Sequence, residues 1–148
     1  MGKTIAVSNL EVDISVACCN LFCDGAAKWL ANEPIEGVQG GRAYIRYDPH
    51  GVVLSIAPFN FPLFTAIQNS IGNVIAGNTS IIKPEESCAA VGELLNQAAA
   101  EAGLSSEYQV LFLTFAQVQR IINDRRTVGV SFTGSTMGGS AIAGMAAQ

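Results

Sequence analysis

The sequence predicts an α/β fold, a doubly wound parallel sheet of about four strands with a long N-terminal helix and a protruding strand arm. From Gly51 onward, short, continuously apolar runs rich in β-branched residues alternate with helical stretches, as in parallel sheets buried on both faces. The chain has 148 residues, 49% of them hydrophobic, which suits one domain with a sizeable core. We expect a helix in residues 1–33, the arm in 41–48 and the parallel units in 51–148.

A long amphipathic helix is predicted at the N-terminus. Ser8 and Glu11 have the spacing of a capping box, in which each side chain bonds a backbone N–H near the helix start. Apolar residues then recur at helical spacing as far as Trp29. The helix is expected to run to about Asn32, because Pro34 cannot continue it.

Residues 42–47 predict the arm. Their polar and apolar side chains alternate, and glycines and prolines lie on both sides of them. Because this alternation has the period of a β-strand, we expect an exposed strand or one arm of a hairpin here.

Four strand-then-helix units are predicted after the arm. The strands are expected at residues 52–57, 79–82, 109–113 and 128–132. The helices are expected from Pro62 to Gly77, from Ser87 as N-cap to Gly103, from a capping box of Thr114 and Gln117 to about Asn123, and from Gly134 onward. Right-handed crossovers between such units give a doubly wound sheet, whose ligands bind at the carboxyl ends of the strands.

Composition and charge exclude several function classes. The net charge of -4 and the pI of 4.8 argue against a nucleic-acid surface, which needs clustered lysine and arginine. The four cysteines form no C-x-x-C pair and have no histidine cluster beside them, so we expect buried thiols, with neither a metal site nor a disulfide framework. No run of about 20 apolar residues and no signal-peptide core occurs, so we expect no membrane partner and a cytoplasmic location.

Polar side chains follow the first two predicted strands, at the edge where a ligand would lie. Asn60 either caps the helix that begins at Pro62 or donates its side-chain amide to an oxyanion formed in acyl chemistry. Lys83 and Glu86 follow the second strand. They are either a surface charge and a helix N-terminal acid, or a pair that holds the ribose hydroxyls of an adenine nucleotide.

A glycine-rich turn, residues 134–139 (GSTMGG), follows the fourth predicted strand. Its small residues either let the last helix pack closely against its strand, or leave backbone N–H groups at the positive helix end free to receive a pyrophosphate. The spacing differs from the G-x-G-x-x-G fingerprint, so both interpretations stay open.

The order of four motifs resembles the aldehyde dehydrogenase superfamily. The motifs are GVVLSIAPFNFPL at residues 51–63, AGNTSIIKPEES at 76–87, EAGL at 101–104 and GVSFTGSTMGG at 129–139. Residues 108–135 look like the succinate-semialdehyde dehydrogenase branch, and the resemblance runs from about Ser8 to Gln148. It implies a Rossmann-like dinucleotide-binding fold and the oxidation of an aldehyde substrate to a carboxylate.

The resemblance also implies roles for single residues. Asn60 matches the amide that helps to bind the tetrahedral oxyanion. The cofactor-binding positions that match are Lys83 and Glu86 at the adenosine ribose, and Gly134, Ser135 and Gly139 in the turn under the pyrophosphate. Because a carboxylate at Glu86 would repel a ribose 2′-phosphate, NAD is the expected cofactor, with NADP as the alternative.

Residues 42–47 resemble the first arm of the hairpin through which family members associate. The resemblance therefore implies a homo-oligomer. We expect the strands that pair with this arm to lie outside the chain.

The departures from the family pattern concern catalysis. Phe59 replaces the usual tryptophan, and Met137 stands where glutamate is frequent. The cysteine nucleophile and the glutamate base of the family lie beyond the F-T-G-S helix, and the sequence stops at Gln148 before either motif. We therefore expect a fragment of a succinate-semialdehyde-like dehydrogenase that is inactive alone. The alternatives are a nucleotide-binding module without catalysis and a vestigial folding unit that self-associates.

Overall fold

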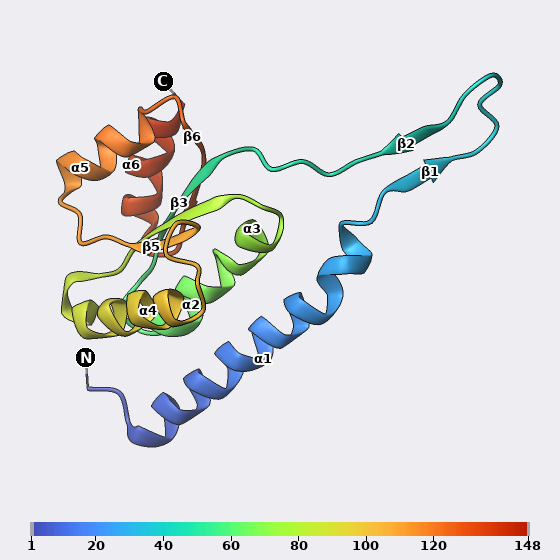
Figure 1. The fold of residues 1–148 in the computed structure, drawn as a ribbon. Coiled ribbons are helices and arrows are strands. Elements are labelled where there is room, and N and C mark those ends of the chain that lie inside the picture. The colour runs from blue at the N-terminus through green and yellow to red at the C-terminus, as the bar shows by residue number, and fades with distance from the viewer. Residues whose placement is uncertain (1, 148) are drawn as a thin grey trace.

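A four-stranded parallel sheet forms the centre of the molecule, as predicted (Figure 1). The computed structural model describes residues 2–147, so Met1 and Gln148, the ends of the predicted domain, lie outside the described residues. The strands in spatial order are β5 (Tyr108–Val110), β4 (Thr79–Lys83), β3 (Val52–Ile56) and β6 (Thr127–Phe132). The strand order reverses between β3 and β6, the place where doubly wound sheets bind their ligands.

Helices cover both faces of this sheet. One face carries α2 (Pro62–Gln68), α3 (Ile71–Ile75) and α4 (Ala89–Glu101), and the other carries α5 (Phe115–Ile122) and α6 (Thr136–Ala146) (Figure 1). Leu54 of β3 is fully buried in the core cluster beneath α5 and α6, and Ile82 of β4 is fully buried in the cluster on the opposite face. The sheet is therefore apolar on both sides, which explains the continuous apolar runs of its strands.

The long helix α1 (Ile5–Trp29) lies within the predicted range of residues 1–33, but it begins before the predicted cap at Ser8. Its N-cap is Thr4, whose hydroxyl accepts a hydrogen bond from the backbone N–H of Val7, so the predicted capping box of Ser8 and Glu11 is wrong. Ser8 lies inside the helix and donates its hydroxyl to the carbonyl of Thr4 at 3.1 Å. Glu11 is free to turn toward the domain, and it is buried there.

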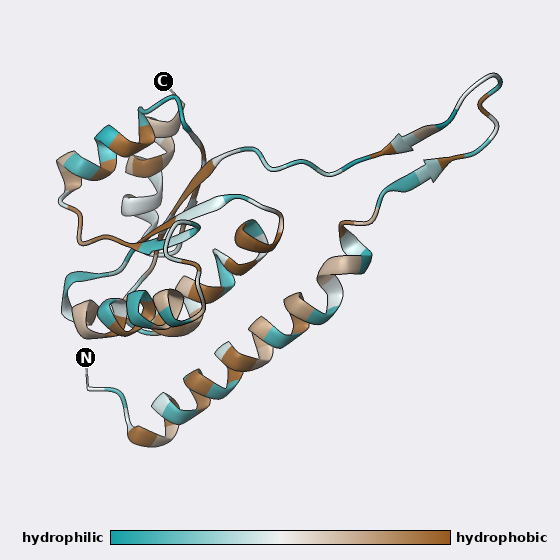
Figure 2. Cartoon of the chain, in the orientation of Figure 1, coloured by the Kyte–Doolittle hydropathy of each residue, from teal (hydrophilic) through white to brown (hydrophobic). Residues whose placement is uncertain are grey.

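By its length and composition, α1 is also apolar enough to cross a membrane. Polar and apolar residues are interspersed along it, however (Figure 2). Two polar residues, Glu11 and Ser15, are its buried positions, and the helix packs on α2 and α3. These contacts are those of a helix packed in a domain. The expected cytoplasmic location stays a prediction.

The predicted arm is an antiparallel ribbon that projects away from the domain (Figure 1). Its strands are β1 (Glu33–Ile35) and β2 (Ala43–Ile45), and Pro34 pairs with Tyr44 in the middle of the ribbon. One partner strand of the arm thus lies in this chain, contrary to our expectation. The helix ends at Trp29 instead of about Asn32, because the chain becomes extended before Pro34.

The helix predicted from Pro62 to Gly77 is interrupted at Asn69 and Ser70. The backbone carbonyl of Asn69 accepts hydrogen bonds from the Ser55 hydroxyl at 3.3 Å and from the Asn73 side chain at 3.0 Å. Side chains that bond the backbone in this way compete with the helical ladder. After the break, the carbonyl of Ser70 accepts a hydrogen bond from the hydroxyl of Ser80 in β4 at 3.5 Å.

The boundaries of the next two helices test three predicted caps. Ser87 does not cap α4, because a short 3-10 helix (Glu86–Cys88) precedes it and Glu85 accepts the N–H of Ser87 at 2.9 Å. Gly103 ends α4 with a positive φ of 73°, as predicted. The capping box of Thr114 and Gln117 at the start of α5 is also confirmed.

Candidate functional site

The carboxyl ends of the three longer strands meet at one edge of the sheet. Ile56 is in register with Lys83 on one side and with Phe132 on the other. The N–H of Ala57 donates to the carbonyl of Lys83 at 3.0 Å, and the N–H of Thr133 donates to the carbonyl of Ile56 at 3.1 Å. Backbone pairing therefore fixes where the loops after β3, β4 and β6 begin.

Lys83 and Glu86 line a hollow of about 260 Å³ at this edge. Lys83 is the last residue of β4, and Glu86 opens the short 3-10 helix that follows. The salt bridges of the described residues include none between these two side chains. Both also line an adjoining hollow of about 200 Å³ toward the end of β5. The structure thus brings the predicted ribose-binding pair together on one wall.

The other walls of the hollow are apolar and come from α5, α6 and the ends of β3 and β6. Apart from Gly138, which belongs to the predicted glycine turn, sequence reasoning did not single out these residues as part of a site. They are Ile56, Leu113, Phe115, Val118, Phe132, Ala141 and Ile142. The helical spacing of Gly138 and Ile142, one turn apart on α6, is the signal that would have indicated a common face. An apolar slot with a lysine and a carboxylate on one wall fits a flat heterocycle that carries a sugar.

The predicted glycine turn lies at the N-terminus of α6. Ser135 is the N-cap, and its hydroxyl accepts the N–H of Gly138 at 3.1 Å. The N–H of Gly139 donates to the Ser135 carbonyl at 2.9 Å, so it belongs to the helical ladder. The N–H groups of Thr136 and Met137 come before the first helical bond and have no intrahelical acceptor. These two donors, and not that of Gly139, can bind an anion.

The glycines of this turn are also needed for packing. A Cβ atom on Gly134 would lie 2.6 Å from Cζ of Phe132, and one on Gly138 would lie 2.8 Å from the same atom. The Phe132 ring therefore rests directly on the first turn of α6. Of the predicted turn residues, Gly134, Ser135 and Gly139 do not line the hollow, whereas Gly138 does.

Asn60 lies in the turn between β3 and α2. It is exposed, and it is not the N-cap of α2, because Phe61 occupies that position and makes no side-chain cap bond. The capping interpretation of Asn60 is therefore wrong. Asn60 does not line the hollow of Lys83 and Glu86 either. Among residues 2–147 its side-chain amide has no hydrogen-bond partner, and it lies in the turn that follows the central strand β3.

None of the four cysteines lines this hollow. Cys18, Cys19 and Cys23 lie on α1, where burial, and then the neighbouring thiols, raise the pKa of Cys19. Cys88 is buried, and its Sγ atom lies 3.7 Å from the carbonyl oxygen of Phe59. The raised pKa opposes the thiolate form of Cys19. Cys88 is packed as expected, whereas Cys23 is exposed, so the expectation of buried thiols is wrong for Cys23.

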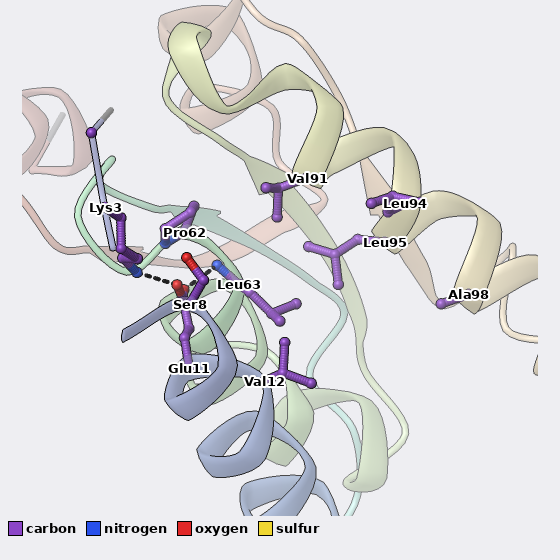
Figure 3. A pocket seen from close by; sticks show the side chains of 11 residues that line it. Lys3, Ser8, Glu11, Val12, Pro62, Leu63, Val91, Leu94, Leu95 and Ala98 are labelled. Carbon is purple, nitrogen blue, oxygen red and sulfur yellow. Dashed lines mark hydrogen bonds and ion pairs between the residues drawn. The ribbon is translucent and has the colours of Figure 1, made fainter. Parts of the chain in front are cut away.

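A larger hollow of about 600 Å³ lies between α1, α2 and α4 (Figure 3). Its walls are mainly aliphatic, and its charged side chains, Lys3 and Glu11, form an ion pair with each other. Volume alone would favour this hollow as the site. The smaller hollow has the free charged groups, and we therefore assign the candidate site to it.

Comparison with known proteins identifies the family of the chain. The model of the aldehyde dehydrogenase family matches residues 1–148. The chain is 34% identical over 149 residues to succinate-semialdehyde dehydrogenase [NADP(+)] 1 of Mycobacterium ulcerans (strain Agy99), covering 99% of this chain and 32% of the relative. It is 31% identical over 147 residues to an aldehyde dehydrogenase of Paenarthrobacter nicotinovorans, covering 97% of this chain and 32% of the relative.

Among solved structures, the succinic semialdehyde dehydrogenase from Streptococcus pyogenes in complex with NADP+ superimposes with a TM-score of 0.92 at 32% identity. The match covers 99% of this chain and 32% of that one. The chain thus spans about a third of the length of the relatives it matches. Because the family model matches residues 1–148, which is the whole of this chain, the chain belongs to the aldehyde dehydrogenase family.

Proposed function

We propose that this chain is the dinucleotide-binding part of an NAD(P)-dependent aldehyde dehydrogenase that oxidises a semialdehyde to a carboxylate. The observation that carries the proposal is the hollow at the carboxyl edge of the sheet, which Lys83 and Glu86 line together with Gly138 of α6. The names of the curated relatives support a succinate-semialdehyde-like substrate.

The shape of the hollow suggests how an adenine nucleotide is held. The apolar walls from α5 and α6 receive the adenine ring, and the side chains of Lys83 and Glu86 bind the ribose hydroxyls. The free N–H groups of Thr136 and Met137 bind the pyrophosphate at the positive end of α6. When bound, the nicotinamide supplies the acceptor for the hydride that leaves the aldehyde carbon.

Asn60 is proposed as the oxyanion donor. Its amide is exposed at the end of β3 and is not used in capping α2, so it can donate to an oxygen that becomes negative during acyl chemistry. This chemistry also needs a thiolate nucleophile and a base. The four cysteines lie in α1 or beneath Phe59, so the polypeptide of 148 residues is expected to have no turnover by itself.

Calorimetric titration of the polypeptide with NAD and with NADP tests the nucleotide site. We expect binding of either dinucleotide, and its loss in the double variant Lys83→Met and Glu86→Ala. A matched control is Lys28→Met, which removes a lysine from the far end of α1. Absence of binding at millimolar dinucleotide would refute the proposal. If the polypeptide alone formed NADH or NADPH in the presence of an aldehyde, the claim that none of its four cysteines is a nucleophile would be wrong.

The exposed ribbon supports a second part of the proposal, a homo-oligomer. Ile35, Tyr44 and Ile45 are 47–54% exposed although they are large and apolar, and isolated two-stranded ribbons are marginally stable in water. We propose that the ribbon packs against another copy of the chain. Light scattering should then give a mass above that of a monomer, and the variant Ile45→Lys should reduce it.

A further inference from the structure

We propose that Glu11 of α1 is a positioning residue for the Asn60 turn, and that it keeps the Asn60 amide free by capping α2 in its place. This inference rests on the proposed role of Asn60 as an oxyanion donor. Glu11 precedes the turn by about fifty residues in the sequence, and no local pattern connects the two segments.

The first turn of α2 has only two N–H groups that need an outside partner. Pro62 has no N–H, and the N–H of Thr65 donates to the carbonyl of Phe61 at 3.0 Å. The remaining donors, those of Leu63 and Phe64, both bond Oε1 of Glu11, at 2.8 Å and 3.1 Å. A single distant carboxylate thus satisfies the whole N-terminus of this helix.

The second oxygen of Glu11 is held as well. Oε2 of Glu11 accepts a hydrogen bond from Nζ of Lys3, and the two side chains are only 6% and 11% exposed (Figure 3). The Lys3 ammonium also lies 4.2 Å from the centre of the Phe61 ring, within the range of a cation–π contact. The Lys3–Glu11 pair therefore contacts the chain at Phe61, Leu63 and Phe64, directly after Asn60.

Without Glu11, the turn before α2 could adopt another state, in which Asn60 caps the helix. Asparagine is among the best N-cap residues, whereas Phe61, which holds the N-cap position, has no side-chain acceptor. If the carboxylate of Glu11 is removed, the N–H groups of Leu63 and Phe64 lose their acceptor inside the protein. Within the turn itself, Asn60 has a side-chain carbonyl that could accept the N–H of Leu63, three residues further on. Capping by Asn60 would turn its N–H₂ group away from the position that the proposed function requires.

Amide exchange and the Asn60 side-chain resonances of ¹⁵N-labelled polypeptide test this inference. In Glu11→Ala we expect the exchange protection of Leu63 and Phe64 to fall about tenfold or more, because each N–H loses a bond to a charged acceptor. The Asn60 side-chain N–H₂ signals should shift in the same variant. Glu11→Gln keeps an acceptor oxygen, so it should restore protection to within about threefold of the original chain.

Two further variants separate positioning from general loss of stability. Ser15→Ala removes another buried polar group of α1, whose hydroxyl donates to the Glu11 carbonyl at 2.6 Å, and it should leave the Asn60 signals unchanged. Lys3→Met removes the ammonium and should affect the Phe61 ring signals more than the N–H of Leu63.

The outcomes distinguish this inference from the proposed function. Unchanged Asn60 signals and unchanged protection of Leu63 and Phe64 in Glu11→Ala would overturn the inference, whatever the polypeptide binds. Equal shifts of the Asn60 signals in Ser15→Ala and Glu11→Ala would overturn it too. Failure of the original chain to bind NAD or NADP would instead count against the proposed function, because Glu11 does not line the nucleotide hollow.

Discussion

Replacement of Tyr108 by phenylalanine should stabilise the protein against alkaline unfolding. Tyr108 begins β5, and its side chain lines a cavity of about 150 Å³ beside Ser70 and Cys19. Its hydroxyl is buried and has no hydrogen-bond partner among the described residues. Burial raises the pKa of Tyr108 from 10.0 to about 12, and the nearby Ser70 hydroxyl offsets this only in part.

The sign of the pH effect follows from the two pKa values. Above pH 10 the unfolded chain loses the Tyr108 proton, while the folded chain retains it until about pH 12. The folded state then binds more protons, so the free energy of unfolding falls as the pH rises through this interval. Two pKa units correspond to about 3 kcal/mol at most. Below pH 10 the variant should be neutral or more stable by about 1 kcal/mol, since an unpartnered buried hydroxyl is removed.

The free energies of unfolding of the original chain and of Tyr108→Phe can be measured by urea titration at pH 7, 9, 10.5 and 11.5, followed by far-ultraviolet circular dichroism. Because the lysines and the remaining tyrosines are the same in both proteins, only the difference between their two curves of stability against pH is used. We expect the difference in the free energy of unfolding between the variant and the original protein to be constant up to about pH 10 and to increase above it. A constant difference across the whole pH range would contradict the assigned pKa. A loss of more than about 1 kcal/mol at pH 7 would show that the hydroxyl has a partner in solution.

Three other substitutions address the candidate site and the helix that bounds it. Glu86→Gln should strengthen NADP binding about fivefold relative to NAD binding in calorimetry, because about 1 kcal/mol of charge repulsion with the 2′-phosphate is removed at about 4 Å in water. Gly138→Ala should weaken dinucleotide binding with little change in thermal stability, since the better helix former offsets the displaced ring of Phe132. Thr114→Ala should lower the free energy of unfolding by about 1 kcal/mol in a urea titration, because it removes the cap of α5.

The features predicted correctly from the sequence are those whose partners lie within a few residues. The capping box of Thr114 and Gln117 spans four residues and occurs as expected. Gly103 ends its helix because only its own backbone conformation is involved. Likewise, Lys83 and Glu86 come together because one follows a strand directly and the other is three residues further on.

The features predicted wrongly depend on partners that are distant in the sequence. Ser8 and Glu11 have the spacing of a capping box, but Glu11 bonds α2 instead. Asn69 interrupts a helix because Ser55, on the neighbouring strand, donates to its carbonyl. The apolar walls of the hollow were missed for another reason: residues such as Ile142 belong to the same periodic pattern as the core, so periodicity alone cannot separate the two roles.

The glycine turn shows that a packing role and a binding role can belong to the same residues. Gly134 and Gly138 permit the close approach of Phe132, because a Cβ atom at either position would collide with the ring. The same ring lines the hollow beside Lys83, so the packing of the turn sets the position of one wall. Phosphate binding by N–H groups of α6 would need that turn in the same place. The two interpretations that the sequence left open are therefore not exclusive, and substitution at Gly138 should alter binding through packing.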